Sequence, residues 1–111
     1  MPQTTIGRGN ILYDWLLSVT LTWSGTVGAT STAELTAAIP GLQFGDYIDM
    51  YLIGGGQVTG LTQINFRVSA PGVLAAQFSN STAGALTPSV GPYLVNVCRP
   101  ESFQNLPNTA G

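Results

Sequence analysis

Apolar and polar residues alternate along much of this chain, and the alternation predicts β-strands. Over residues 15–23, every second residue is aromatic or aliphatic, and the residues between them are mostly serine or threonine. The same period of two recurs over residues 33–39, where Pro40 ends the run. Successive side chains of a strand point to opposite faces, so each run has one face to bury and one to leave in water. We therefore expect antiparallel strands, although residues 33–38 can also be read as a short helix.

The rest of the chain contains further strand-like runs separated by turn residues. These runs cover residues 47–53, 61–70, 73–79 and 92–99. Pro71-Gly72 is a typical turn pair between two of them, and small residues make a loop of residues 80–91. Six strands at this spacing predict an all-β domain, which is either an antiparallel β-sandwich or a jelly-roll-like barrel.

The two ends of the chain do not share this pattern. Pro2, Gly7 and Gly9 interrupt the start, and the polar stretch after Pro100 has only two apolar anchors. We expect an extended N-terminal arm (residues 1–13), one sandwich domain (residues 14–100) and a C-terminal tail (residues 101–111). The apolar residues of these ends are our candidates for contact with other subunits or another protein: Ile6, Ile11, Leu12, Tyr13, Phe103 and Leu106.

Ionisable residues are scarce, and this limits the possible functions. Charged residues make up 7% of the chain, against an average of about 25%. Three arginines, no lysine and a net charge of -2 cannot provide the basic surface that nucleic-acid binding requires. A serine nucleophile would have neither histidine nor lysine as its base. We therefore expect no enzyme, no catalytic residue, no cofactor, no metal site and no nucleic-acid partner, and a tendency to self-associate.

The few charged side chains have structural interpretations. Asp46 and Asp49 would point to opposite faces of one strand, so we interpret them as a turn residue and a solvated strand residue. Arg67 and Arg99 lie in predicted strands, where pairing with carboxylates is the expected role.

Other motifs predict little chemistry. No apolar run approaches the roughly 18 residues of a membrane span, and the start lacks a secretory signal pattern, so we expect synthesis in the cytoplasm and no membrane partner. Asn80-Ser81-Thr82 matches an N-glycosylation acceptor, which we interpret as a coincidence in a polar loop. Cys98 is the only cysteine, so no internal disulfide is possible, and we expect it to pack as a small apolar residue.

The aromatic residues permit two interpretations. They could form a carbohydrate-stacking surface, or they could fill the core and subunit interfaces. Their period-two spacing favours core and interface. The residues concerned are Trp15, Trp23, Tyr47, Tyr51 and Tyr93.

Several short segments occur in an order that is shared with a known group of proteins. They are Thr32-Ala33-Glu34, Ile39-Pro40-Gly41-Leu42, Gly45-Asp46, Arg67-Val68-Ser69-Ala70, Phe78-Ser79-Asn80, Thr87-Pro88, Tyr93-Leu94-Val95-Asn96-Val97 and Arg99-Pro100. In this order and spacing, over about residues 30–101, the chain resembles small head-associated virion proteins of tailed bacteriophages, which often serve as capsid cement or decoration proteins.

The resemblance implies a structural protein on the capsid exterior whose partner is the major capsid protein. A homotrimer would match the local threefold axes of an icosahedral lattice and would hide exposed sheet edges. Two alternatives remain open. One is a carbohydrate- or host-surface-binding module of a fibre or spike, with Tyr47, Tyr51 and Trp23 exposed. The other is a connector or tail component.

Overall fold

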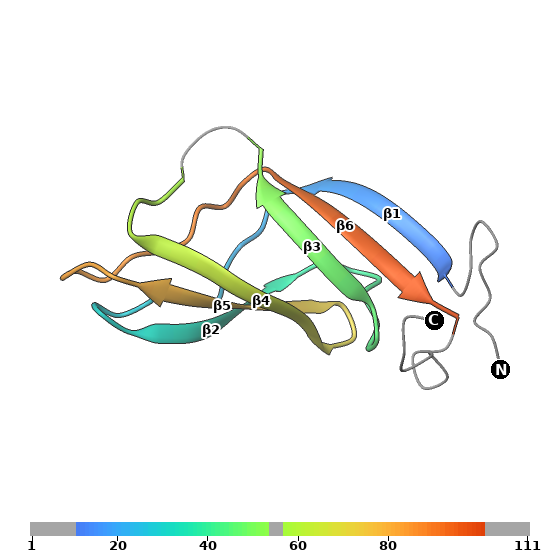
Figure 1. Cartoon of the computed structure of the whole chain (residues 1–111), viewed down its shortest axis with the longest axis horizontal. Coiled ribbons are helices and arrows are strands. Elements are labelled where there is room, and N and C mark those ends of the chain that lie inside the picture. Colours follow the sequence, from blue (N-terminus) through green and yellow to red (C-terminus); the bar gives the residue numbers. More distant parts are fainter. Residues whose placement is uncertain (1–10, 54–56, 102–111) are drawn as a thin grey trace, which may run out of the picture.

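The chain folds into two antiparallel three-stranded sheets that pack together as a β-sandwich (Figure 1). The computed structural model describes residues 11–53 and 57–101. One sheet has the strand order β1 (Ile11–Val19), β6 (Tyr93–Pro100) and β3 (Tyr47–Leu52); the other has the order β2 (Thr32–Ala38), β5 (Val73–Asn80) and β4 (Leu61–Ala70). The predicted six-stranded sandwich is confirmed, and residues 33–38 lie in a strand, so the helical alternative is wrong.

Most connections cross from one sheet to the other. Only β4 and β5 are neighbours both in the sequence and in a sheet, and the turn at Pro71-Gly72 joins them. Gly72 has a φ of 76°, a backbone conformation that glycine adopts without steric cost. The central strands are β6 and β5, so β1, β3, β2 and β4 are the four edge strands of the sandwich.

Strand β1 is displaced from its predicted position. It begins at Ile11, inside the segment predicted as an arm, because β6 continues to Pro100 and provides pairing partners, including Arg99 for Tyr13. It ends at Val19, where the chain crosses to the second sheet. There the Leu21 N–H donates to Val90 O (2.8 Å) and the Ser24 N–H to Thr36 O (2.9 Å).

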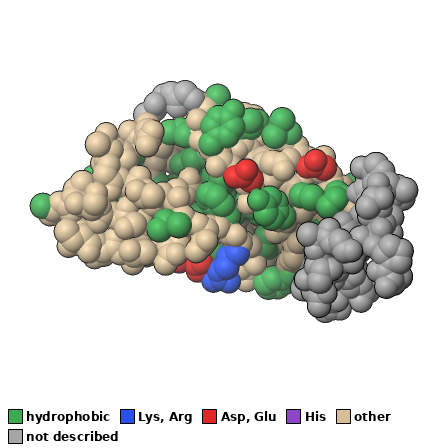
Figure 2. Space-filling view, in the orientation of Figure 1, with side chains coloured by type: hydrophobic (Ala, Val, Ile, Leu, Met, Phe, Trp, Pro, Cys, Tyr) green, Lys and Arg blue, Asp and Glu red, His purple; other side chains and the backbone are tan. Residues whose placement is uncertain are grey.

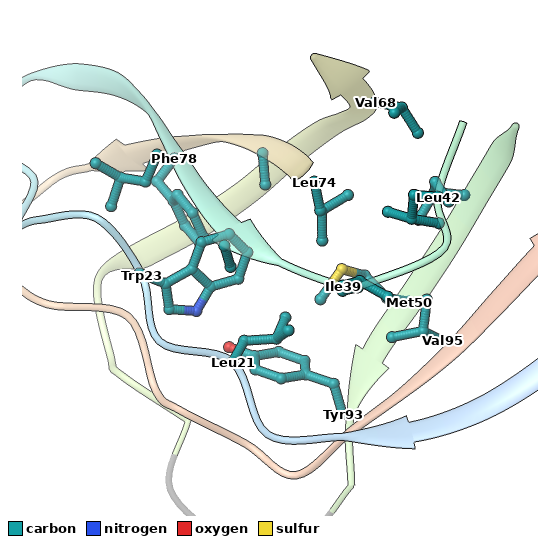
Figure 3. Packing of buried hydrophobic residues seen from close by; sticks show 14 of the residues in the cluster. Leu21, Trp23, Ile39, Leu42, Met50, Val68, Leu74, Phe78, Tyr93 and Val95 are labelled. Atoms are coloured by element: carbon teal, nitrogen blue, oxygen red, sulfur yellow. The ribbon is translucent and has the colours of Figure 1, made fainter. Parts of the chain in front are cut away.

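The core lies between the sheets and receives side chains from all six strands and from the crossing segment (Figure 3). Leu21 and Trp23 are buried although no strand contains them. The Trp23 ring meets Phe78 edge-on at 5.0 Å, and its Nε1 donates to Ser89 O at 3.1 Å. The Tyr93 hydroxyl donates to the same oxygen at 2.6 Å. The interpretation of Trp23 as an exposed sugar-binding residue is therefore wrong.

Asn80 is a buried polar residue of this core, and its side chain holds the following loop in place. Its Nδ2 donates to Val27 O (3.1 Å) and Gly84 O (2.8 Å), and its Oδ1 accepts from the Thr82 N–H (2.9 Å) and Thr82 Oγ1 (2.7 Å). Because the side-chain nitrogen is buried and bonded, the folded domain does not present the Asn80-Ser81-Thr82 motif for modification.

Candidate interaction surface

The outer face of the β1–β6–β3 sheet carries large apolar side chains in positions that contact water. Leu16 is 66% exposed, Tyr47 65% and Tyr51 60%. They belong to a set that we call the tyrosine face: Asp14, Leu16, Ser18, Tyr47, Asp49, Tyr51, Leu94, Asn96 and Cys98. Figure 2 shows hydrophobic side chains along the upper part of the molecule, with acidic side chains among them. Exposed apolar patches of this kind mark interaction sites more often than scattered single residues do.

The strand register arranges the tyrosine face in three rows across the sheet. Tyr47, Cys98 and Asp14 form one row; Asp49, Asn96 and Leu16 form the next; Tyr51, Leu94 and Ser18 form the third. Asn96 Nδ2 donates to Asp14 Oδ1 at 2.8 Å and to Trp15 O at 3.0 Å. The two carboxylates are the only charged groups in these rows. A cationic group on a partner would therefore meet no repulsion here.

The outer face of the other sheet is different in character. Threonine, serine and glutamine side chains occur along it, Ile64 is exposed in the row of Glu34 and Gln77, and one ion pair crosses it. Arg67 donates to both carboxylate oxygens of Glu34, at 2.8 and 2.7 Å. These residues lie on the two strands flanking β5, where Gln77 is opposite Glu34 and Ala75 is opposite Arg67. The predicted pairing of Arg67 is confirmed, and this polar, internally paired surface offers less to an apolar partner.

A second exposed apolar region lies at the end of the domain where both terminal segments join it. Ile11 is paired with Pro100, so the predicted N-terminal arm and the predicted C-terminal tail join at adjacent strand ends. Leu12 is 41% exposed beside the exposed Phe44, and both line a hollow of about 220 Å³ together with Pro100. Contacts made by the two terminal segments would thus start from the same end of the domain.

A buried ion pair fixes the shape of this end. Arg99 donates through Nε to Asp46 Oδ1 (2.8 Å), through a terminal nitrogen to Asp46 Oδ2 (2.9 Å), and to Gly41 O (3.0 Å). Its guanidinium lies 4.8 Å from the Trp15 ring centroid, and Tyr13 stacks on that ring at 5.0 Å. The loop bearing Phe44 is therefore attached to β6, and the predicted pairing of Arg99 with a carboxylate is confirmed.

Asp46 is both a turn residue and a buried ion-pair partner. Its Oδ2 accepts from the Gln43 N–H at 3.0 Å, as the turn interpretation predicts. Burial by itself would raise the pKa of this carboxyl, but the hydrogen bonds from Arg99 and Gln43 and the arginine charge outweigh burial and lower the pKa below 3.8. Asp49 is exposed on β3, as predicted.

The lowered pKa of Asp46 predicts acid sensitivity. A carboxyl whose pKa is lower in the folded state than in the unfolded state stabilises the fold at pH values above the unfolded-state pKa. This stabilisation is lost as the pH falls through the folded-state pKa. We expect the free energy of unfolding in urea to decrease as the pH is lowered from about 5 to about 2, with a smaller decrease in Asp46→Asn. As a control, Glu34→Gln should keep most of the wild-type decrease, because the Glu34 pair is exposed. Equal acid dependence of Asp46→Asn and the wild type would contradict the assignment.

Cys98 lies in the row between Tyr47 and Asp14 and is half-buried. Burial, together with the charges of Asp14 and Asp46, raises the pKa of its thiol. The protonated thiol is a weak nucleophile, which agrees with a packing role.

The sequence-predicted contact residues are only partly brought together. Ile11, Leu12 and Tyr13 begin β1, where the register shifts between Ile11 and Tyr13. Ile6, Phe103 and Leu106 lie outside the described residues. Sequence reasoning did not single out Leu16 or Phe44. Leu16 stands on the otherwise polar side of the first alternating run, and this mismatch is the signal that indicates an exposed apolar residue.

Comparisons with known proteins do not assign this chain to a family. No family model, curated protein or solved structure matches the chain. Within residues 11–53 and 57–101, no group of three metal-ligating side chains gathers, and no helix is long and apolar enough to cross a membrane.

Proposed function

We propose that this protein is a non-enzymatic structural protein of a bacteriophage virion, a cement or decoration protein that binds the major capsid protein on the capsid exterior. The observation that carries the proposal is the joining of both terminal segments at one end of a rigid sandwich, next to exposed Leu12 and Phe44. Segments that extend from one end can reach under neighbouring shell subunits while the sandwich remains outside.

The chemistry of the surfaces supports the same role. The tyrosine face and the Leu12 end offer apolar area with little charge, which is typical of surfaces that associate with other proteins. A homotrimer would repeat each weak contact three times on a shell, and multivalency would raise the overall affinity without any strong single contact. The resemblance of residues 30–101 to head-associated phage proteins favours a shell as the partner.

The proposal is tested by sedimenting the purified protein with assembled capsid shells of its phage. We expect a homotrimer that pellets with the shells in near-stoichiometric copy number. Deletion of residues 1–10 or of residues 102–111 should abolish this binding while the thermal unfolding midpoint of the domain stays within a few degrees of the wild type, because the deleted segments lie outside the six strands. Truncated proteins that still coat shells would contradict the proposed role of the arms.

A carbohydrate-binding module remains the second candidate because of one specific observation. Tyr47 and Tyr51 are exposed on the same side of β3, with Asp49 between them, and such aromatic side chains can stack on sugar rings. A protein that ignores shells, and whose tyrosine fluorescence is quenched by host polysaccharide in the wild type but not in Tyr47→Ala/Tyr51→Ala, would favour this candidate. A ring stoichiometry other than three would instead favour the connector or tail component.

A further inference from the structure

The centre of the tyrosine face presents a carboxylate between two phenol rings. Tyr47, Asp49 and Tyr51 alternate along β3 and are all exposed, so their side chains leave the same face of the sheet. Residues two positions apart in a strand are about 7 Å apart, which places either ring within reach of a group bound to Asp49. Within the described part of the chain, the Asp49 carboxylate has neither a hydrogen bond nor an ion pair.

The side chain beside Asp49 adds a further acceptor to this centre. Asn96 lies opposite Asp49 in the register of β3 and β6. An amide nitrogen has two hydrogens, and Asn96 Nδ2 donates to both Asp14 Oδ1 and Trp15 O. The Asn96 Oδ1 accepts no hydrogen bond from a described residue. The centre of the tyrosine face therefore presents hydrogen-bond acceptors, one of them charged, next to aromatic rings.

The chain itself shows which side chain fits such a combination. Arg99 donates to both carboxylate oxygens of Asp46, and its guanidinium lies 4.8 Å from the Trp15 ring centroid. A guanidinium is planar, carries five donors and no acceptor, and stacks on aromatic faces, whereas an ammonium is a compact point charge. The exposed group on β3 has the same carboxylate and aromatic components, and it lacks the guanidinium.

We propose that Tyr47, Asp49 and Tyr51 bind an arginine side chain of the protein partner, with the guanidinium paired to the Asp49 carboxylate and stacked on one of the two rings. Leu16 in the row of Asp49 and Leu94 in the row of Tyr51 provide apolar surface around it. This inference rests on the proposed function for the identity of the partner, the major capsid protein. It adds which face of the sandwich meets the shell and the chemistry that the shell brings.

Two other occupants fit this surface less well. A second copy of the described domain would have to bring Arg67 or Arg99, and each of these already binds a carboxylate through two nitrogens. A sugar hydroxyl both donates and accepts hydrogen bonds. Because the amide hydrogens of Asn96 are used within the sheet, a sugar would find acceptors at the centre of the face but no amide donor.

Binding of the full-length protein to shells, measured by sedimentation over a range of protein concentrations, tests the carboxylate. We expect Asp49→Asn to weaken binding by about fivefold or more per contact. Added salt should weaken the wild type more than this variant. Glu34→Gln is the matched control, because it removes the same charge from an exposed carboxylate on the other sheet, and it should bind like the wild type. Equal binding by Asp49→Asn and the wild type would overturn the inference.

Two double variants test the rings. Tyr47→Phe/Tyr51→Phe keeps both ring faces and should bind shells like the wild type. Tyr47→Leu/Tyr51→Leu keeps apolar area but has no ring face, so its binding should fall by about fivefold. Both residues are exposed, so the thermal unfolding midpoints should stay close to the wild type. Equal binding by the leucine and phenylalanine variants would overturn the stacked arrangement.

A second experiment needs no shell. A random peptide library is selected on the wild-type protein and depleted on Asp49→Asn. We expect the remaining peptides to carry arginine beside aliphatic residues and to lose binding when lysine replaces the arginine. Peptides without arginine, or with lysine equally good, would overturn the inference.

The two experiments separate this inference from the proposed function. A wild type that ignores shells but selects arginine peptides contradicts the capsid function alone. Shells that bind Asp49→Asn as tightly as the wild type contradict this inference alone. If Asp49→Asn weakens self-association in sedimentation equilibrium without shells, the arginine comes from a second copy, and the assignment to a shell protein is overturned.

Discussion

Replacing Arg99 with methionine should destabilise the domain by about 3–5 kcal/mol, because the substitution leaves a buried carboxylate without its partner. The side chain of Asp46 has no exposed surface, and that of Arg99 is only 17% exposed. The same arginine also holds the Gly41 carbonyl and lies over Trp15, so the loop bearing Phe44 should loosen as well. Urea unfolding monitored by tryptophan fluorescence measures the change.

The chain provides a matched control for this prediction. Arg67→Met removes the same kind of two-bonded arginine–carboxylate pair, but the Arg67 and Glu34 side chains are 61% and 41% exposed. Exposed pairs contribute about 0–1 kcal/mol, so this variant should remain close to the wild type. If both variants lose equal stability, burial of Asp46 is not the reason why Arg99→Met is destabilised.

Replacing Asn80 with alanine should cost about 2–4 kcal/mol, the second large effect that we expect. The substitution removes four hydrogen bonds and leaves the Val27 carbonyl without its side-chain donor in the core. The loop after β5 then keeps its backbone bonds, including those between Val27 and Leu86, but loses every bond to the side chain of residue 80. Thermal and urea unfolding measure the loss, and hydrogen exchange of the Thr82 N–H reports on the loop.

Two further variants separate hydrogen bonding from side-chain volume. Asn80→Asp keeps the acceptor oxygen but loses both donors and introduces a charge, so it should be at least as destabilising as Asn80→Ala. Asn96→Ala removes an amide that is only half-buried on the tyrosine face and should cost about 1 kcal/mol. An Asn80→Ala protein as stable as Asn96→Ala would show that the Asn80 network contributes little.

Local pattern in the sequence determined the class of this protein and five of its six strands. Strand β4 extends over the predicted residues 61–70, and β2, β3, β5 and β6 begin and end within one residue of the predicted runs. The alternation also identified Leu35, Ala37, Leu21 and Trp23 as residues on a buried face. These features depend on neighbouring residues, because the period-two direction of side chains is a property of the extended backbone itself.

Only the tertiary structure decided which strands meet and which apolar residues stay outside. Strand order depends on long crossing connections that no local pattern encodes, so pairing of β1 with β6 and separation of β3 from β4 could not be read from the chain. Arg99 and Asp46 are 53 positions apart, and no sequence pattern predicts that they pair. Tyr47, Tyr51 and Tyr93 look alike as aromatic strand residues, yet only Tyr93 is in the core. Burial of an aromatic ring requires a second sheet to cover it, and the arrangement of the two sheets is a property of the whole fold.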